Sequence, residues 1–137
     1  MKHLLSVVTL LILVAGCTKP VNTVERAEPL GQPRVVDDRR IVTDKYLGDR
    51  LAVRRVIEST VSGNLLKIQV DLQNESRDRL TFNYRFEWYD LDGMQVQTPT
   101  SVWRPKTLLG KESTAVAAVA PNPRAKDFVL KLVRPQH

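Results

Sequence analysis

Residues able to do acid–base or nucleophilic chemistry are few in this chain of 137 residues. The two histidines are His3 and His137, and Cys17 is the only cysteine. Nucleophilic catalysis of the Ser–His–Asp or Cys–His kind needs an imidazole held at fixed geometry, and zinc needs several nitrogen or sulfur ligands. We therefore expect no enzyme, and we predict no catalytic residue, no metal site and no cofactor.

Carboxylates are the remaining candidates for chemistry. Asp90 and Asp92 come just before Gly93, a spacing shared with calcium loops. A complete EF-type loop needs a glutamate at its twelfth position, where this chain has Ser101, so a plain hairpin turn is favoured. Strand alternation predicts that Glu87 faces solvent. An acid pair for glycoside hydrolysis is a further alternative, but nothing in the sequence singles out two such residues.

Cys17 has a different chemical context. Lys2 supplies a basic start, an apolar run covers residues 4–14, and residues 14–17 read Val-Ala-Gly-Cys. This layout is typical of a secretory signal, and the run is too short for a membrane span of about 20 residues. Residues 14–17 resemble the lipobox of bacterial lipoproteins. We therefore predict a signal peptide over residues 1–16 and lipidation of Cys17.

Thr18 follows the predicted lipidation site. In enteric bacteria an aspartate at this position retains lipoproteins in the inner membrane, so its absence here resembles the outer-membrane pattern. Two or three acyl chains on one cysteine give stable membrane attachment, whereas one chain binds only marginally. The expected location is the outer membrane, with the folded domain in the periplasm.

Residues 17–34 resemble a flexible tether in composition. This stretch has three prolines, a glycine, charges of both signs and few large apolar side chains. Such a segment buries too little apolar surface to offset the entropy of ordering it. The remaining residues, 35–137, are enough for one domain.

The pattern from residue 35 onward is one of short alternating strands. Residues 66–72 and 80–89 alternate apolar with polar side chains, and residues 90–93 form the turn between two strands. Residues 112–120 are small on both faces and are expected to be buried. The predicted strands cover residues 40–43, 51–57, 66–72, 80–89, 94–98, 112–120 and 128–132. They predict an all-β fold: an antiparallel immunoglobulin-like or fibronectin-III-like sandwich of about seven strands without a disulfide.

Three side chains stand out as a possible interaction surface: Tyr89, Trp103 and Arg104. Trp88 continues the apolar side of its strand and is expected in the core, which leaves Tyr89 on the opposite face. Trp103 and Arg104 fall between predicted strands. An exposed tryptophan beside an arginine suits a sugar ring or a protein partner, although it also suits a cover over the core edge.

The net charge of +6 has an ordinary interpretation. Basic pairs at residues 39–40 and 54–55 are interleaved with acidic side chains, which is typical of a mixed, soluble surface. Attraction to anionic lipid head groups or acidic polymers is the alternative. No nucleic-acid-binding motif is present, so we expect no nucleic-acid partner.

Residues 84–90 read Tyr-Arg-Phe-Glu-Trp-Tyr-Asp and are followed by Asp92 and Gly93. This stretch resembles the central motif of the YcfL-like family, small Gram-negative lipoproteins of unassigned function. Trp103, the Leu-Leu-Gly at 108–110 and the Val-Ala-Pro-Asn-Pro at 119–123 fit the same pattern, so that the resemblance covers about residues 35–133 together with the lipobox. It implies a periplasmic β-sandwich and carries no catalytic residues.

Together these features predict a non-enzymatic accessory domain of the cell envelope. Its lipid anchor on Cys17 binds it to the membrane, and a tether holds it near other membrane proteins, where weak contacts suffice. The expected partner is another envelope protein. The alternative is a module that binds glycan, peptidoglycan or a small ligand through an aromatic patch near Trp103.

Overall fold

The structure is a computed structural model that describes residues 38–136. The predicted signal peptide, the lipidation site Cys17 and the predicted tether lie outside the described residues, as does His137. Within the described part, strands account for most of the chain and one short helix interrupts them. The all-β prediction is confirmed.

Eight strands and the helix follow one another through residues 38–136. In order they are β1 (Ile41–Thr43), α1 (Lys45–Gly48), β2 (Leu51–Val61), β3 (Leu65–Asn74), β4 (Leu80–Tyr89), β5 (Gln95–Val96), β6 (Arg104–Leu108), β7 (Ser113–Val119) and β8 (Asp127–Val133). Two elements were not expected from the sequence, α1 and β6. The return strand predicted over residues 94–98 is only two residues long.

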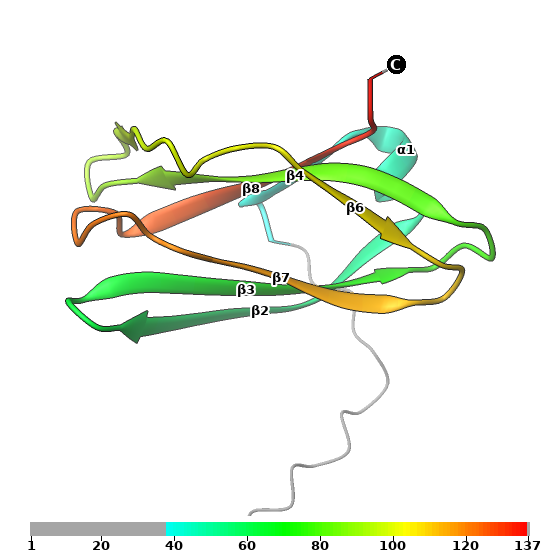
Figure 1. Cartoon of the computed structure of the whole chain (residues 1–137), viewed down its shortest axis with the longest axis horizontal. Coiled ribbons are helices and arrows are strands. Elements are labelled where there is room, and N and C mark those ends of the chain that lie inside the picture. Colours follow the sequence, from blue (N-terminus) through cyan, green and yellow to red (C-terminus); the bar gives the residue numbers. More distant parts are fainter. Residues whose placement is uncertain (1–37, 137) are drawn as a thin grey trace, which may run out of the picture. The chain divides into compact units, whose positions relative to one another are not determined.

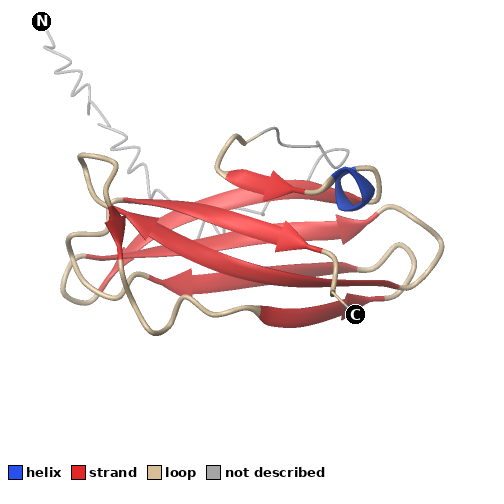
Figure 2. Cartoon of the chain, turned by 90° about the horizontal axis from the view of Figure 1, so that it is seen from above, coloured by secondary structure: helices blue, strands red, loops and turns tan. Residues whose placement is uncertain are grey.

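The strands form two sheets that pack as a sandwich, which confirms the predicted architecture (Figure 1). A five-stranded sheet has the order β1-β8-β4, with β5 and β6 both pairing with the far side of β4. A three-stranded sheet has the order β2-β3-β7. All pairings are antiparallel except that of β1 with β8. Figure 2 shows the same strands from above, with α1 at one end.

The core lies between the two sheets and follows the period of two in the sequence. Alternate residues of β3, β4 and β8 point inward, because successive side chains of a strand face opposite sides. Trp88 is only 2% exposed, which confirms its expected place in the core. The main core side chains of these strands are Ile68, Val70, Leu72, Leu80, Phe82, Phe86, Trp88, Phe128, Leu130 and Leu132.

The expectation that residues 112–120 are buried is wrong. β7 pairs only with β3 and is the edge of its sheet. Of its seven residues only Val116 is buried. Small side chains on both faces suit an exposed edge as well as a buried centre, so composition alone did not decide between them.

A fully buried asparagine fixes the crossover from β6 to β7, which carries the chain from one sheet to the other. The side-chain amide of Asn74 donates to the carbonyl oxygens of Asp78 (2.7 Å) and Leu109 (2.9 Å). Its oxygen accepts the backbone N–H of Ser76 at 3.0 Å. Buried amides of this kind hold loops because an unpaired one is costly. The crossover therefore brings β6 and β7 to the same side of the sandwich.

Candidate functional site

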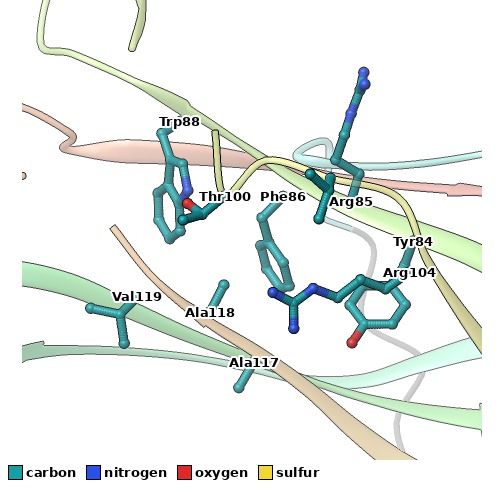
Figure 3. Close-up of a pocket in the computed structure, with 10 residues that line it drawn as sticks. Tyr84, Arg85, Phe86, Trp88, Thr100, Arg104, Ala117, Ala118 and Val119 are labelled. Atoms are coloured by element: carbon teal, nitrogen blue, oxygen red, sulfur yellow. The ribbon is translucent and has the colours of Figure 1, made fainter. Parts of the chain in front are cut away.

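A cavity of about 110 Å³ lies between β4 and β6 on one side and β7 on the other (Figure 3). We call it the edge cleft, and it is bounded by β4, β6, β7 and the loop of residues 97–103. An engineered apolar cavity of about 150 Å³ holds a benzene ring. The edge cleft is thus of a size to take one aliphatic side chain.

Three aromatic side chains from β4 form its floor: Tyr84, Phe86 and Trp88. They share one face of the strand because they alternate with polar residues. The rings of Tyr84 and Phe86 lie edge to face at 6.4 Å, and those of Phe86 and Trp88 are stacked at 6.1 Å. This aromatic packing gives the cleft a rigid, apolar floor.

The opposite wall comes from β7, and small side chains explain why space remains there. Ala118 points toward the aromatic floor, where a larger side chain would fill the space (Figure 3). Ala117 and Val119 also line the cleft, but strand alternation turns their side chains to the outer face of β7. Val119 is 42% exposed, and Val102, across the cleft on the loop before β6, is 48% exposed. Apolar surface therefore continues from the cleft out to its rim.

Arg104 is the only cation of the lining besides Arg85. Its register opposite Tyr84 places both side chains on the same side of the sheet. Figure 3 shows its guanidinium turned toward Phe86 and Tyr84, while Arg85 points the other way. Among residues 38–136, no carboxylate pairs with the Arg104 guanidinium. The cleft thus has an uncompensated positive charge beside apolar surface.

The backbone of β7 adds unpaired hydrogen-bonding groups to this site. The bonds from Asn74 N–H to Glu112 O (2.9 Å) and from Ala120 N–H to Leu66 O (2.7 Å) show that even-numbered residues pair with β3. In an antiparallel ladder the intervening residues direct their N–H and C=O groups away from that partner. The four residues with outward-directed groups are Ser113, Ala115, Ala117 and Val119. No strand within the described residues pairs with them.

The structure separates the three side chains that the sequence grouped as a surface. Trp103 and Tyr89 lie on the outer face of the five-stranded sheet, whereas Arg104 turns to the cleft. The Arg85 guanidinium stacks on the Trp103 ring at 4.5 Å, and Trp103 is 41% exposed. Only Arg104 of the three contributes to the edge cleft.

Glu87 differs most from its expectation. It lies on the outer face as alternation predicted, yet it is only 3% exposed, so the expectation that it faces solvent is wrong. Arg85 and Lys131 (3.0 Å) form ion pairs with its carboxylate, and the Tyr89 hydroxyl donates to it at 3.2 Å. These three side chains cover the Glu87 carboxylate on the outer face of the sheet and shield it from solvent.

Burial raises the pKa of the Glu87 carboxyl, but hydrogen bonds from Lys131 and Arg85 lower it by more, so the net shift is downward. A carboxyl whose pKa is lowered by folding stabilises the protein above its unfolded pKa, near 4.5. That contribution is lost as the pH falls through the lower, folded pKa. Glu87 therefore makes stability depend on pH in the acid range.

Replacing Glu87 by glutamine is expected to lower the free energy of unfolding at pH 7 by about 2 kcal/mol, because two cations lose their charged acceptor. The difference between variant and native protein should shrink on acidification below pH 4.5. Urea unfolding at a series of pH values measures it. Asp38 and Asp44, whose pKa values are also lowered, are present in both proteins and cancel. A difference that stays constant with pH would contradict this role.

The turn after β4 has the geometry of a plain hairpin. Asp90 Oδ1 accepts the backbone N–H groups of Asp92 (3.0 Å) and Met94 (2.9 Å), and Gly93 supplies a positive φ of 78°. The side chain of Asp90 is thus used within the turn. Across residues 38–136, no three His, Cys, Asp or Glu side chains are grouped to hold a metal ion. In the same residues no helix is long and apolar enough to span a membrane.

Known proteins resemble this chain as follows. Residues 38–134 match the family described as "Protein of unknown function (DUF1425)". A crystal structure of a DUF1425 member from Shewanella sp. pv-4 aligns with a TM-score of 0.58 and 25% identity, over 64% of this chain and 80% of that one. The crystal structure of Campylobacter jejuni cj0090 aligns with a TM-score of 0.62 over 72% of this chain and 100% of that one. At 18% identity the latter supports the fold alone. No curated protein matches.

Proposed function

This chain belongs to the DUF1425 family, whose function is unknown, and from that premise we propose that it is a non-enzymatic lipoprotein that binds another envelope protein through the edge cleft. The cleft combines apolar surface, an unpaired cation and an unpaired strand edge. Each of these is a recognised means of holding a protein segment. No catalytic family is indicated by the match. The relation to YcfL-like proteins remains a resemblance.

The proposed anchor is a lipid on Cys17, in the outer membrane and facing the periplasm. It is supported by the basic start, the apolar run and the Val-Ala-Gly-Cys at residues 14–17. A tether of roughly twenty residues gives an average reach of about 25 Å, which keeps the domain near membrane-bound partners. Mass spectrometry of the protein from its native host tests this. An unmodified Cys17 thiol, or a retained leader, would remove the anchor from the proposal.

Glycan binding through Trp103 is less well supported than protein binding. One face of the Trp103 ring is already covered by the Arg85 guanidinium. Neither the edge cleft nor the open hollow of about 960 Å³ near Tyr46 and Arg134 includes Trp103 in its lining. Sugar stacking needs a free aromatic face in a concave site. The edge cleft is therefore the better candidate.

Photo-crosslinking in cells tests the proposed function. A photo-reactive residue at Val119 or Val102, on opposite rims of the cleft, is expected to capture the same envelope protein. The matched control is Thr60, which is exposed on the other edge of the three-stranded sheet. Absence of a product at both cleft positions, or an identical product at Thr60, would contradict binding through the edge cleft.

A further inference from the structure

The two edges of the three-stranded sheet are protected very differently. β2 forms one edge and carries Arg54, Arg55 and Glu58, with a register shift between Val53 and Arg55. Charges and bulges on an edge strand are the usual means of preventing another strand from pairing with it. β7 forms the other edge and reads Ser-Thr-Ala-Val-Ala-Ala-Val, without charge, proline or bulge. Of these two edges, only β7 is left open to a further strand within the described residues.

A strand added to β7 would direct alternate side chains into the edge cleft. Side chains of an added strand alternate between the two faces of the sheet, as those of β7 do. On the inner face they would lie beside Ala118 and above the aromatic floor, in a space of about 110 Å³. One aliphatic side chain fits there. Main-chain hydrogen bonds to Ala115, Ala117 and Val119 would supply affinity, and the cleft would supply specificity.

Arg104 indicates the charge of the added segment. Its guanidinium lines the cleft and has no carboxylate partner within residues 38–136. Guanidinium groups bind carboxylates through two parallel hydrogen bonds, which gives the pair a defined geometry. A second copy of this chain pairing through its own β7 would bring only the Glu112 carboxylate, which already accepts the backbone N–H of Leu109 at 2.6 Å. An acidic partner complements the cleft and a second copy does not.

The first described residues of the chain lie far from the β7 edge. Residue 38 leads into β1, which lies at the opposite side of the five-stranded sheet from β6. Arg40, next to β1, pairs with Glu58 on β2, so the chain enters beside the β2 edge. The open β7 edge is therefore on the side of the domain away from where the described chain begins, where a separate protein has access.

We propose that β7 binds an extended segment of another envelope protein by strand addition, and that this segment places an aliphatic side chain in the edge cleft and an acidic side chain, two residues away, against Arg104. This inference rests on the proposed function and specifies the mode of binding. Main-chain pairing holds the segment, the aliphatic side chain covers Phe86 and Trp88, and the carboxylate neutralises the cation at the rim.

Selection from a library of short random peptides tests the predicted chemistry. The bait is the full-length lipidated protein in detergent. The peptides enriched by selection are expected to carry an aliphatic residue and an acidic residue two positions apart. Winners without an acidic residue, or no enrichment over bait-free beads, would overturn the proposal. Size-exclusion chromatography of the protein without peptide measures its oligomeric state and so tests whether a second copy of the chain occupies β7. A dimer abolished by Ala117→Pro would also overturn it.

A charge swap tests the role of Arg104. Arg104→Glu is expected to weaken the binding of the best selected peptide about tenfold. Replacing the acidic residue of that peptide by lysine should restore its affinity for the variant. Lys106→Glu is the matched control, since Lys106 lies two residues along the same strand and outside the cleft lining. Equal losses in both variants, or no restoration by the swapped peptide, would contradict the assignment.

Proline substitution tests the main-chain pairing itself. Ala117→Pro removes only an outward N–H of β7 and leaves the bonds to β3, so it should abolish peptide binding without unfolding the protein. Ala117→Ser keeps that N–H and is expected to bind normally. Unchanged binding by a folded Ala117→Pro protein would overturn strand addition. The crosslinks at Val102 and Val119 distinguish binding through the edge cleft from binding by strand addition. If the crosslinks form but the peptide, charge-swap and proline experiments give the opposing results, the partner binds the cleft without adding a strand to β7.

Discussion

Replacement of Gly110 by alanine is expected to lower the free energy of unfolding by about 3 kcal/mol. A Cβ at this position would lie 2.1 Å from the carbonyl oxygen of Arg77 and 2.5 Å from its carbonyl carbon. Both are backbone atoms, which cannot swing away as a flexible side chain does. The crossover from β6 to β7 would have to move, and the hydrogen bonds of Asn74 to Leu109 and Asp78 would move with it.

Gly63→Ala is the matched control for this prediction. Gly63 has a φ of 74°, and nothing lies within 4 Å of an added Cβ. Its replacement should therefore cost only the backbone strain, about 1 kcal/mol. Urea unfolding of the two variants at neutral pH measures the difference. Equal losses in both, or a smaller loss at Gly110, would show that contact with Arg77 does not hold the crossover in place.

Trp88→Ala is expected to lower the free energy of unfolding by roughly 3–5 kcal/mol. This is a large part of the total of about 5–15 kcal/mol that is usual for a domain. Trp88 is 2% exposed, stacks on Phe86 and lines both the core and the edge cleft. Its removal leaves a void between the sheets and withdraws part of the cleft floor. Denaturation measured by circular dichroism gives the loss of stability.

The second tryptophan provides the comparison. Trp103 is 41% exposed and contacts the Arg85 guanidinium on the outer face. Trp103→Ala removes little buried surface and one cation–π contact, so it should cost less than about 1.5 kcal/mol. Comparable losses for the two tryptophans would contradict the placement of Trp88 as the core residue and Trp103 as a surface cover.

The centre of the fold was predictable because its strands are buried on one face. Residues 66–72 and 80–89 alternate strictly, and the structure places their apolar side chains between the sheets. β7 was not predictable in the same way. A strand with small residues on both faces gives no period to read, so its position at an edge depends on which strands pair, which is a tertiary property.

The candidate site was predicted only in part. Arg104 was singled out and lines the cleft, but Trp103 and Tyr89 lie on the opposite face of the sheet. The sequence predicts that Trp103 and Arg104 lie between strands, and outside a strand the alternation of faces gives no guide to where they point. Successive residues of a strand point to opposite faces. Extending β6 back by one residue therefore places Trp103 and Arg104 on different sides of the sheet.

Burial of Glu87 could not be read from its own strand. Alternation gives the face on which a side chain lies and says nothing of what covers it there. Lys131 comes from β8, more than forty residues later, and reaches Glu87 only because β4 and β8 are neighbours in register. Only the pairing of the strands brings the charges together.

Hydrogen exchange of the β7 amides in the full-length protein tests the central claim, that this edge is open to a partner. Slow exchange is expected for Thr114, Val116 and Ala118, whose N–H groups pair with β3, and fast exchange for Ala115, Ala117 and Val119. The fast amides should slow when a selected peptide is added. Slow exchange at these three positions in the free protein would mean that the edge is already occupied, and would contradict the claim.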